Sequence, residues 1–128
     1  MQLNYMAIEG LVDIMLHYGL LKAPPQEIIK EGHYKKYYPH GIGHWLGIDV
    51  HDAGKTMVQG LPRAFEPGMI FTIEPGIYIP EKDESAPAAL RGIGIRIEDN
   101  ILVTENGHKN LTEGVPKEVE EIENLMKK

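Results

Sequence analysis

The sequence predicts an α+β fold in which an antiparallel sheet is flanked by helices. Two observations lead to this fold class: an amphipathic pattern occupies the first 20 residues, and the strand-like segments that follow are grouped together. Strands grouped in this way favour an antiparallel sheet over an array of alternating strands and helices. A chain of 128 residues is long enough for one domain with a core of its own.

The helices are predicted towards the two ends of the chain. Apolar residues recur at spacings of three and four over residues 2–20, which indicates an amphipathic helix that stops at Gly19. The residues of this stripe are Leu3, Met6, Ala7, Leu11, Ile14 and Met15. A short helix is predicted over residues 25–30, because Pro25 suits a first helical turn, and a last helix over residues 115–128.

The strands are predicted between these helices. Residues 33–54 are rich in His, Tyr and Gly without a helical period, so we expect a loop with short strands. A β-rich run from Met69 to Tyr78 is interrupted at Pro75-Gly76. The polar, proline-bearing residues 80–90 are expected to form an exposed connection.

A further strand pattern covers residues 93–98. Isoleucines at three alternate positions form one face, and Arg96 and Glu98 lie on the other. Residues 101–103 could continue this strand or pair with it, and Gly107 is expected in a turn.

Composition and charge exclude several classes of protein. Thirteen Lys and Arg residues against nineteen Asp and Glu give a formal net charge of −6, which leaves no basic face for nucleic acid. The chain has no cysteine, which rules out disulfides and cysteine-based zinc sites. No apolar run approaches the roughly 20 residues that cross a membrane, and the N-terminal residues do not resemble a signal peptide. We therefore expect a cytoplasmic protein with no nucleic-acid or membrane partner.

The densest chemical signal is the segment from His40 to Asp52. Three histidines and two aspartates fall within these thirteen residues, and three glycines allow the backbone to bend sharply. Neutral imidazole is a good ligand for borderline metals and also titrates near neutral pH. The alternative reading is a glycine-rich surface loop in which the histidines are coincidental.

Two carboxylates change the balance between these readings. Glu74 follows an apolar run and precedes a turn, where an isolated glutamate is more often a solvated strand end. Arg96 and Glu98, taken alone, could equally be the solvent-facing side of an edge strand. Taken together, one histidine and two glutamates make a nitrogen and oxygen ligand set that suits Mn, Co, Zn or Fe. Two metal ions about 3.5–4 Å apart, bridged by carboxylates, are a common hydrolytic device.

Three motifs resemble the Xaa-Pro aminopeptidase (aminopeptidase P) branch of the pita-bread metallopeptidases. They are HGIGHWLGIDVHD at residues 40–52, TIEPGIYIP at residues 72–80 and RGIGIRIEDNILVTENG at residues 91–107. They occur in the family's order and, with the flanking helices, cover almost the whole chain. The resemblance implies a curved pita-bread sheet, with residues 1–128 forming the C-terminal portion of the catalytic domain.

The resemblance also implies a metal centre. His44, Glu74 and Glu98 match the positions of metal ligands, and Glu98 would be the carboxylate that bridges both ions. We expect two divalent ions, with manganese as the first candidate and cobalt, zinc or iron as alternatives.

The remaining matched positions imply roles in catalysis. His40 and His51 are similar to family histidines that bind substrate and stabilise the tetrahedral intermediate. Arg96 is similar to an arginine that supports the hydrogen-bond network of the active site. The reaction implied is hydrolysis of the bond between an N-terminal residue and a following proline, so the expected partner is a proline-containing peptide substrate.

Part of the family's site has no counterpart in the sequence. The family has two further aspartate ligands and another substrate-binding histidine, and Asp13, Asp49 and Asp52 match none of the aspartate positions. We therefore expect a piece that is inactive alone and needs the missing N-terminal half of the catalytic domain as a partner. Without that half it should expose an apolar face or an open sheet edge, so we expect it to form homo-oligomers.

Three alternatives to this function stay open. Prolidase is the close rival, since the choice between a dipeptide and a longer substrate depends largely on regions absent from this sequence. A non-catalytic pita-bread module that binds peptides or proteins is the second, although such a module has no need of metal-ligand chemistry. A purely structural domain is the third, and it would require three motifs to coincide.

Overall fold

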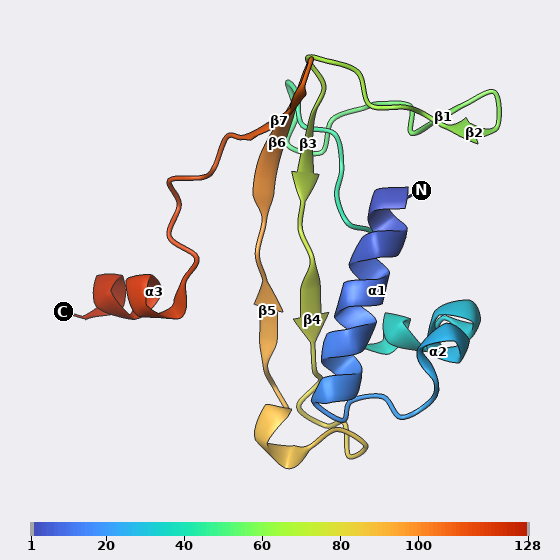
Figure 1. Ribbon diagram of the computed structural model, residues 1–128. Coiled ribbons are helices and arrows are strands. Elements are labelled where there is room, and N and C mark those ends of the chain that lie inside the picture. Colours follow the sequence, from blue (N-terminus) through green and yellow to red (C-terminus); the bar gives the residue numbers. More distant parts are fainter. Residues whose placement is uncertain (1, 128) are drawn as a thin grey trace. The chain divides into compact units, whose positions relative to one another are not determined.

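Figure 1 shows the computed structural model of the chain, which describes residues 2–127. The chain divides into two compact units, each built from two stretches of sequence. The first unit contains the residues up to Ile42 together with Glu74–Arg96. The second unit contains Gly43–Ile73 together with the residues from Ile97 onward. Each unit is described separately below.

The first unit is built on helix α1 (Gln2–His17), which is the long helix predicted from the sequence. It ends two residues before the predicted stop at Gly19, and it buries one side of its apolar stripe. Helix α2 (Pro25–Glu31) confirms the predicted short helix, with Pro25 in its first turn. It packs against α1, as Figure 1 also shows, and is followed by the 3-10 turn η1 (His33–Lys36).

A two-stranded antiparallel hairpin completes this unit. Strand β4 (Gly76–Tyr78) pairs with β5 (Gly94–Arg96), and the 3-10 turn η2 (Ala88–Leu90) lies in their connection. The hairpin and the helices share one apolar core, in which the most buried side chains include two tyrosines. The buried core residues are Ile8, Leu11, Val12, Met15, Leu20, Ile28, Tyr37, Tyr38, Ile79 and Ala86.

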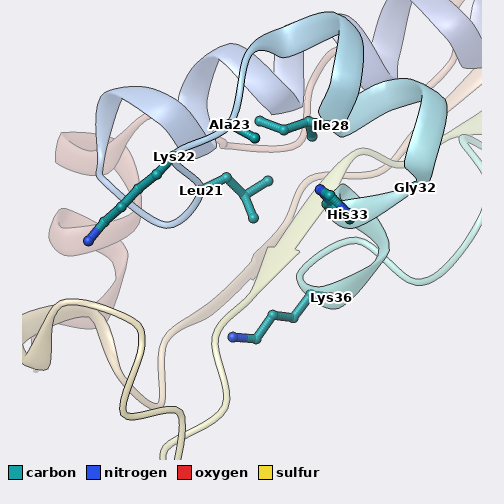
Figure 2. Close-up of a pocket in the computed structure, with 7 residues that line it drawn as sticks. All are labelled: Leu21, Lys22, Ala23, Ile28, Gly32, His33 and Lys36. Carbon is teal, nitrogen blue, oxygen red and sulfur yellow. The ribbon is translucent and has the colours of Figure 1, made fainter.

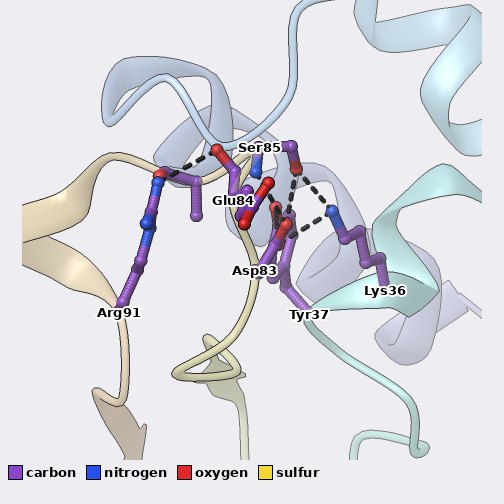
Figure 3. A network of polar contacts seen from close by, with 7 residues as sticks. Lys36, Tyr37, Asp83, Glu84, Ser85 and Arg91 are labelled. Atoms are coloured by element: carbon purple, nitrogen blue, oxygen red, sulfur yellow. Dashed lines mark hydrogen bonds and ion pairs between the residues drawn. The ribbon is translucent and has the colours of Figure 1, made fainter.

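The connection between β4 and β5 is fixed by polar contacts that Figure 3 shows. We call them the Asp83 cluster, which consists of Lys36, Tyr37, Asp83 and Ser85. Arg91 donates to the carbonyl oxygens of Ala86 and Glu84, both at 3.0 Å. The predicted exposed connection is therefore only partly exposed, because these bonds hold it and Ala86 is buried in the core.

The second unit is built on a three-stranded antiparallel sheet in the order β3-β6-β7. Strand β3 (Ile70–Ile73) pairs with β6 (Asp99–Thr104), which pairs with β7 (Gly107–Asn110). A small hairpin of β1 (Met57–Val58) and β2 (Leu61–Pro62) lies in the preceding loop. The antiparallel arrangement confirms the predicted α+β class.

The last helix is shorter than predicted. Helix α3 (Val119–Met126) begins three residues after Pro116, at the end of an extended connection, and all of its residues are exposed. The predicted end at Lys128 lies outside the described residues. Amphipathic residues alone do not set a helix start, and here Pro116 and the contacts of Lys117 keep the preceding segment extended.

Other expectations need correction. Residues 33–54 contain no strand, only an isolated bridge between Trp45 and Phe71, because glycine-rich segments favour loops. Strand β7 was not expected from a sequence that reads Gly-His-Lys-Asn. The pattern over residues 93–98 breaks after Arg96, so Glu98 lies between β5 and β6 and outside both strands.

The predicted exposed apolar surface is present in both units. Ile93 and Ile95 of the first unit are 42% and 62% exposed, and Ile97 of the second is 44% exposed. Strand β5 also pairs on one side only within its sheet. Among residues 2–127, we find no helix with the length and hydrophobicity that crossing a bilayer requires.

Candidate functional site

The second unit holds the histidine loop against strand β3. The amide of Thr72 donates to the carbonyl of His44 (2.9 Å), and the amide of His44 donates back to the Thr72 hydroxyl (3.0 Å). A Cβ atom at Gly43 would collide with the carbonyl of Thr72, so only glycine permits this close approach. The backbone of His44 is therefore fixed on the sheet, although it belongs to no regular strand.

The His44 ring is oriented by its own neighbour. Its Nδ1 lies 2.9 Å from the carbonyl oxygen of Trp45. A carbonyl oxygen only accepts, so Nδ1 carries the proton and Nε2 carries the lone pair of the neutral ring. The Nε2 atom lies 3.9 Å from Oε1 of Glu98. The nitrogen that can bind a metal is thus turned towards a carboxylate.

His51, seven residues after His44, contacts the His44 side chain. Its ring centroid lies 4.3 Å from that of His44, with the two planes nearly perpendicular. Asp52 caps the loop between them, since its carboxylate accepts the amides of Ile48 and Ala53. The second unit therefore brings together three of the predicted site residues: His44, His51 and Glu98.

The first unit brings together two others, Glu74 and Arg96. The amide of Glu74 donates to the carbonyl of Ile42 at 2.7 Å, which fixes the residue just before β4. Its Oε2 lies 3.8 Å from Nε of Arg96, on the partner strand β5. The Glu74 side chain is 13% exposed, so the guanidinium stands beside a largely shielded carboxylate.

His40 also belongs to the first unit, where it meets Tyr78. Its Nδ1 lies 2.8 Å from the carbonyl of Gly41, so Nδ1 carries the proton, and Nε2 lies 2.9 Å from the Tyr78 hydroxyl. The rings of Tyr38 and Tyr78 both contact the His40 ring edge-on. Burial, followed by the charge of Glu74, raises the pKa of Tyr38 to about 12.

Sequence reasoning missed two features near these residues. It gave no role to Tyr78, and the only signal was its position four residues after Glu74. It also missed what we call the Asp99 cluster, which consists of Asp99, Asn110, Thr112 and Lys117. This cluster depends on contacts between residues far apart in the sequence, and no local pattern reveals it.

A pocket elsewhere in the first unit carries no comparable chemistry. It is lined by residues between Leu21 and Lys36, with an apolar floor that includes Ile28 (Figure 2). Lys22 extends away from the other lining side chains, and the ammonium of Lys36 is already paired with Asp83. We therefore assign this pocket no part in the candidate site.

Comparison with known proteins decides the family. Residues 7–105 match metallopeptidase family M24, a stretch that contains His44, Glu74 and Glu98. The chain belongs to family M24. Divalent metal ions are accordingly part of its family's chemistry.

The most similar M24 relatives share one activity in their names. The Xaa-Pro aminopeptidase of Haemophilus influenzae is 52% identical over 118 residues, which are 92% of this chain. The structure of Pseudomonas aeruginosa aminopeptidase PepP is 48% identical, with a TM-score of 0.89 over 93% of the chain. Zinc-substituted Escherichia coli aminopeptidase P, in complex with product, is 46% identical with a TM-score of 0.84. These matches confirm the pita-bread fold class and the predicted resemblance.

The chain spans about a quarter of the length of the relatives it matches. It covers 26% of the H. influenzae protein and 27% of the chain in the P. aeruginosa structure.

Proposed function

We propose that this chain supplies one histidine and two glutamates of the metal centre in an enzyme that hydrolyses Xaa-Pro peptide bonds. The observation that carries the proposal is the orientation of His44, whose Nδ1 donates to the Trp45 carbonyl while Nε2 faces Glu98. Metal-ligating histidines typically donate their other ring N–H to a carbonyl or carboxylate. His40 makes the same kind of Nδ1 contact, so His44 is distinguished by its Nε2 atom, which faces the Glu98 carboxylate.

The donor set fits a divalent transition metal. The three proposed ligands, His44, Glu74 and Glu98, offer one imidazole nitrogen and two carboxylate groups. When bound, such ions polarise a carbonyl group and lower the pKa of a coordinated water to about 7. We propose two ions bridged by Glu98, with manganese as the native metal. The zinc-substituted relative supports a site that accepts several divalent ions.

Chain connectivity supports including Glu74. Glu74 is bonded to Ile73, Glu98 is bonded to Asp99, and Ile73 and Asp99 are paired across β3 and β6. Glu74 therefore directly follows the last residue of β3, and Glu98 directly precedes the first residue of β6. Each glutamate is thus one residue from a paired position of the sheet, which supports the proposal that both belong to one metal centre.

The other three residues are proposed to serve the substrate and the ligands. Arg96 contacts Glu74, so we assign it to orienting that carboxylate within the hydrogen-bond network. His51, whose ring contacts that of His44, is proposed to bind substrate and stabilise the tetrahedral intermediate. His40, with its Nδ1 protonated, is assigned to substrate binding on the first unit.

A complete site needs further ligands, and we propose that the missing N-terminal half of the catalytic domain supplies them. The chain matches only 26% of the H. influenzae relative, and its other aspartates fit no ligand position. This supports reading residues 1–128 as the C-terminal portion of the catalytic domain, inactive alone. The cytoplasmic location and the formation of homo-oligomers stay predictions.

Prolidase activity and a non-catalytic binding role are the rival functions. The relatives named Xaa-Pro aminopeptidase favour the aminopeptidase over prolidase. The Nε2 atom of His44, which faces the Glu98 carboxylate, favours a metalloenzyme over a module that only binds peptides.

The test is a chimera in which this chain replaces the matching 118 residues of the H. influenzae Xaa-Pro aminopeptidase. Purified chimera, loaded with Mn²⁺, is assayed on a tripeptide with proline second and on an Xaa-Pro dipeptide. Metal content is measured by mass spectrometry on the same samples. The Glu98→Ala and His51→Ala variants of the chimera are measured in parallel.

We expect turnover of the tripeptide, loss of both metal and turnover in Glu98→Ala, and retained metal with reduced turnover in His51→Ala. Normal turnover in Glu98→Ala would refute the ligand assignment. Turnover of the dipeptide reports on the regions that the H. influenzae protein supplies and serves as a control. A folded, metal-free chimera without turnover would favour the binding module.

A further inference from the structure

The Asp99 cluster lies directly beside a proposed metal ligand. Asp99 is the first residue of β6 and follows Glu98, which lies outside both neighbouring strands. The position of Asp99 therefore sets where the backbone of Glu98 enters the sheet. Asp99 is also paired with Ile73, the residue that precedes Glu74.

The Asp99 side chain is held by two groups from a later part of the chain. Its Oδ1 accepts the Thr112 hydroxyl at 2.6 Å and lies 2.9 Å from Nζ of Lys117. The Thr112 oxygen in turn accepts the backbone amide of Asn100 at 3.1 Å. The Thr112 hydroxyl thus bonds both the Asp99 side chain and the backbone amide of Asn100, the first two residues of β6.

The segment that carries these groups is itself fixed. We call residues 111–117 the strap. Leu111 donates its amide to the Asn100 carbonyl at 2.8 Å, and the Thr112 amide donates to Oδ1 of Asn110 at 2.9 Å. Lys117 donates to the carbonyls of Thr112 (3.0 Å) and Val115 (3.2 Å) as well as to Asp99, so all three of its protons have acceptors.

From this arrangement we infer that Lys117 and Thr112 are positioning residues for the metal centre, which act on Glu98 through Asp99. The inference rests on the proposed function, because it needs Glu98 to be a ligand. Glu98 is bonded to Asp99 in the chain, so the groups that hold Asp99 also restrict the backbone of Glu98. Groups that support metal ligands typically change metal affinity about 10–100-fold when removed.

The experiment uses the whole 128-residue chain and Zn²⁺ as the probe, since Zn²⁺ is diamagnetic and weak binding can be followed by NMR amide shifts. The variants are Lys117→Met, Thr112→Val and the conservative Thr112→Ser. Lys36→Met is the matched control, because it removes a lysine from the Asp83 cluster, which belongs to the first unit. Amide hydrogen exchange is measured on the same metal-free samples.

We expect Lys117→Met and Thr112→Val to weaken Zn²⁺ binding about tenfold and to speed amide exchange at Asn100. Thr112→Ser keeps the hydroxyl, so its Zn²⁺ affinity and its amide exchange at Asn100 should stay close to those of the original chain. Lys36→Met should change neither the Zn²⁺ affinity nor the amide exchange. Unchanged affinity in Lys117→Met would overturn the inference, as would an equal loss in Lys36→Met, which would indicate general destabilisation.

The two proposals fail in different ways. If the Xaa-Pro aminopeptidase chimera that carries the unaltered chain binds no metal, the proposed metal centre fails, and the positioning role fails with it. If the chain binds Zn²⁺ while amide exchange at Asn100 is unchanged in both strap variants, only the positioning inference is overturned.

Discussion

The Asp83 and Asp99 clusters each contain a lysine, an aspartate and a hydroxyl group, but they hold different parts of the fold. Lys36 lies 2.8 Å from Asp83, and Lys117 lies 2.9 Å from Asp99, each pair joined by a nearby hydroxyl. Hydrogen bonds from Lys36, Ser85 and Tyr37 hold the pKa of Asp83 well below its usual range. Burial opposes the same effect at Asp99, but the hydrogen bonds from its cluster outweigh it and its pKa is also lowered.

The difference lies in what each cluster fastens. The Asp83 cluster ties the β4–β5 connection to η1, and its lysine is 45% exposed. The Asp99 cluster ties the strap to the first residue of β6, and both partners are 23% exposed. Similar polar chemistry therefore stabilises the β4–β5 connection in one unit and adjoins a proposed ligand in the other. The position in the fold, rather than the residue types, assigns the role.

The largest expected effect is at Asp99. Asp99→Ala leaves the Lys117 ammonium and the Thr112 hydroxyl without their shared acceptor, and we expect a loss of about 2 kcal/mol in the free energy of unfolding. Urea denaturation of the metal-free chain, followed by circular dichroism, measures it. Asp13→Ala, at an exposed position on α1, should change stability by less than about 0.5 kcal/mol. If Asp99→Ala and Asp13→Ala lost equal free energy of unfolding, the Asp99 cluster would contribute no particular stability.

A smaller effect is expected at Tyr37, the buried member of the Asp83 cluster. Its hydroxyl donates to Oδ2 of Asp83 at 2.7 Å, while its ring is fully buried in the core. Tyr37→Phe keeps the ring and removes the bond, so we expect a loss of about 1 kcal/mol. Thermal unfolding measures it. A loss as large as that of Asp99→Ala would mean that the Asp83 cluster is the stronger of the two.

Much of the first unit could be predicted from the sequence because its signals are local. The apolar stripe over residues 2–20 and the proline before residues 26–31 each specify a helix through neighbouring residues. The break at Pro75-Gly76 likewise separates two strands in the structure, β3 and β4.

The second unit was harder to predict because its contacts are distant in sequence. His44 is held by Thr72, and Asp99 by Lys117, and no period in the sequence links either pair. The candidate ligands were found by family motifs, whereas the strap that adjoins one of them has no motif. Physical contacts of this kind appear only when the chain is folded.

The stability of the chain at acid pH should show the contribution of the Asp83 cluster. A carboxylate whose pKa is lowered in the folded state stabilises the fold above its unfolded pKa, about 3.9, and loses that contribution as the pH falls further. Asp83→Asn should therefore reduce the drop in urea midpoint between pH 5 and pH 3. Asp13→Asn, on the exposed face of α1, is the control and should leave the drop unchanged. An undiminished drop in Asp83→Asn would show that other carboxylates dominate acid unfolding.

The smallest effect is expected at Tyr38, which is as deeply buried as its neighbour Tyr37 but outside the cluster. Its hydroxyl is buried and has no hydrogen-bond partner within residues 2–127. Tyr38→Phe removes a polar group that gains nothing from its surroundings, so stability near neutral pH should stay within about 0.5 kcal/mol or rise.

Alkaline unfolding gives this last variant a second readout. Because the pKa of Tyr38 is raised to about 12, the folded chain resists its ionisation and loses stability as the pH rises from about 10 towards 12. Tyr38→Phe should flatten this part of the profile, whereas Tyr37→Phe should not remove it. If both tyrosine variants lose equal stability at neutral pH, the hydroxyl of Tyr38 has a partner in solution, and the contrast between the two neighbours disappears.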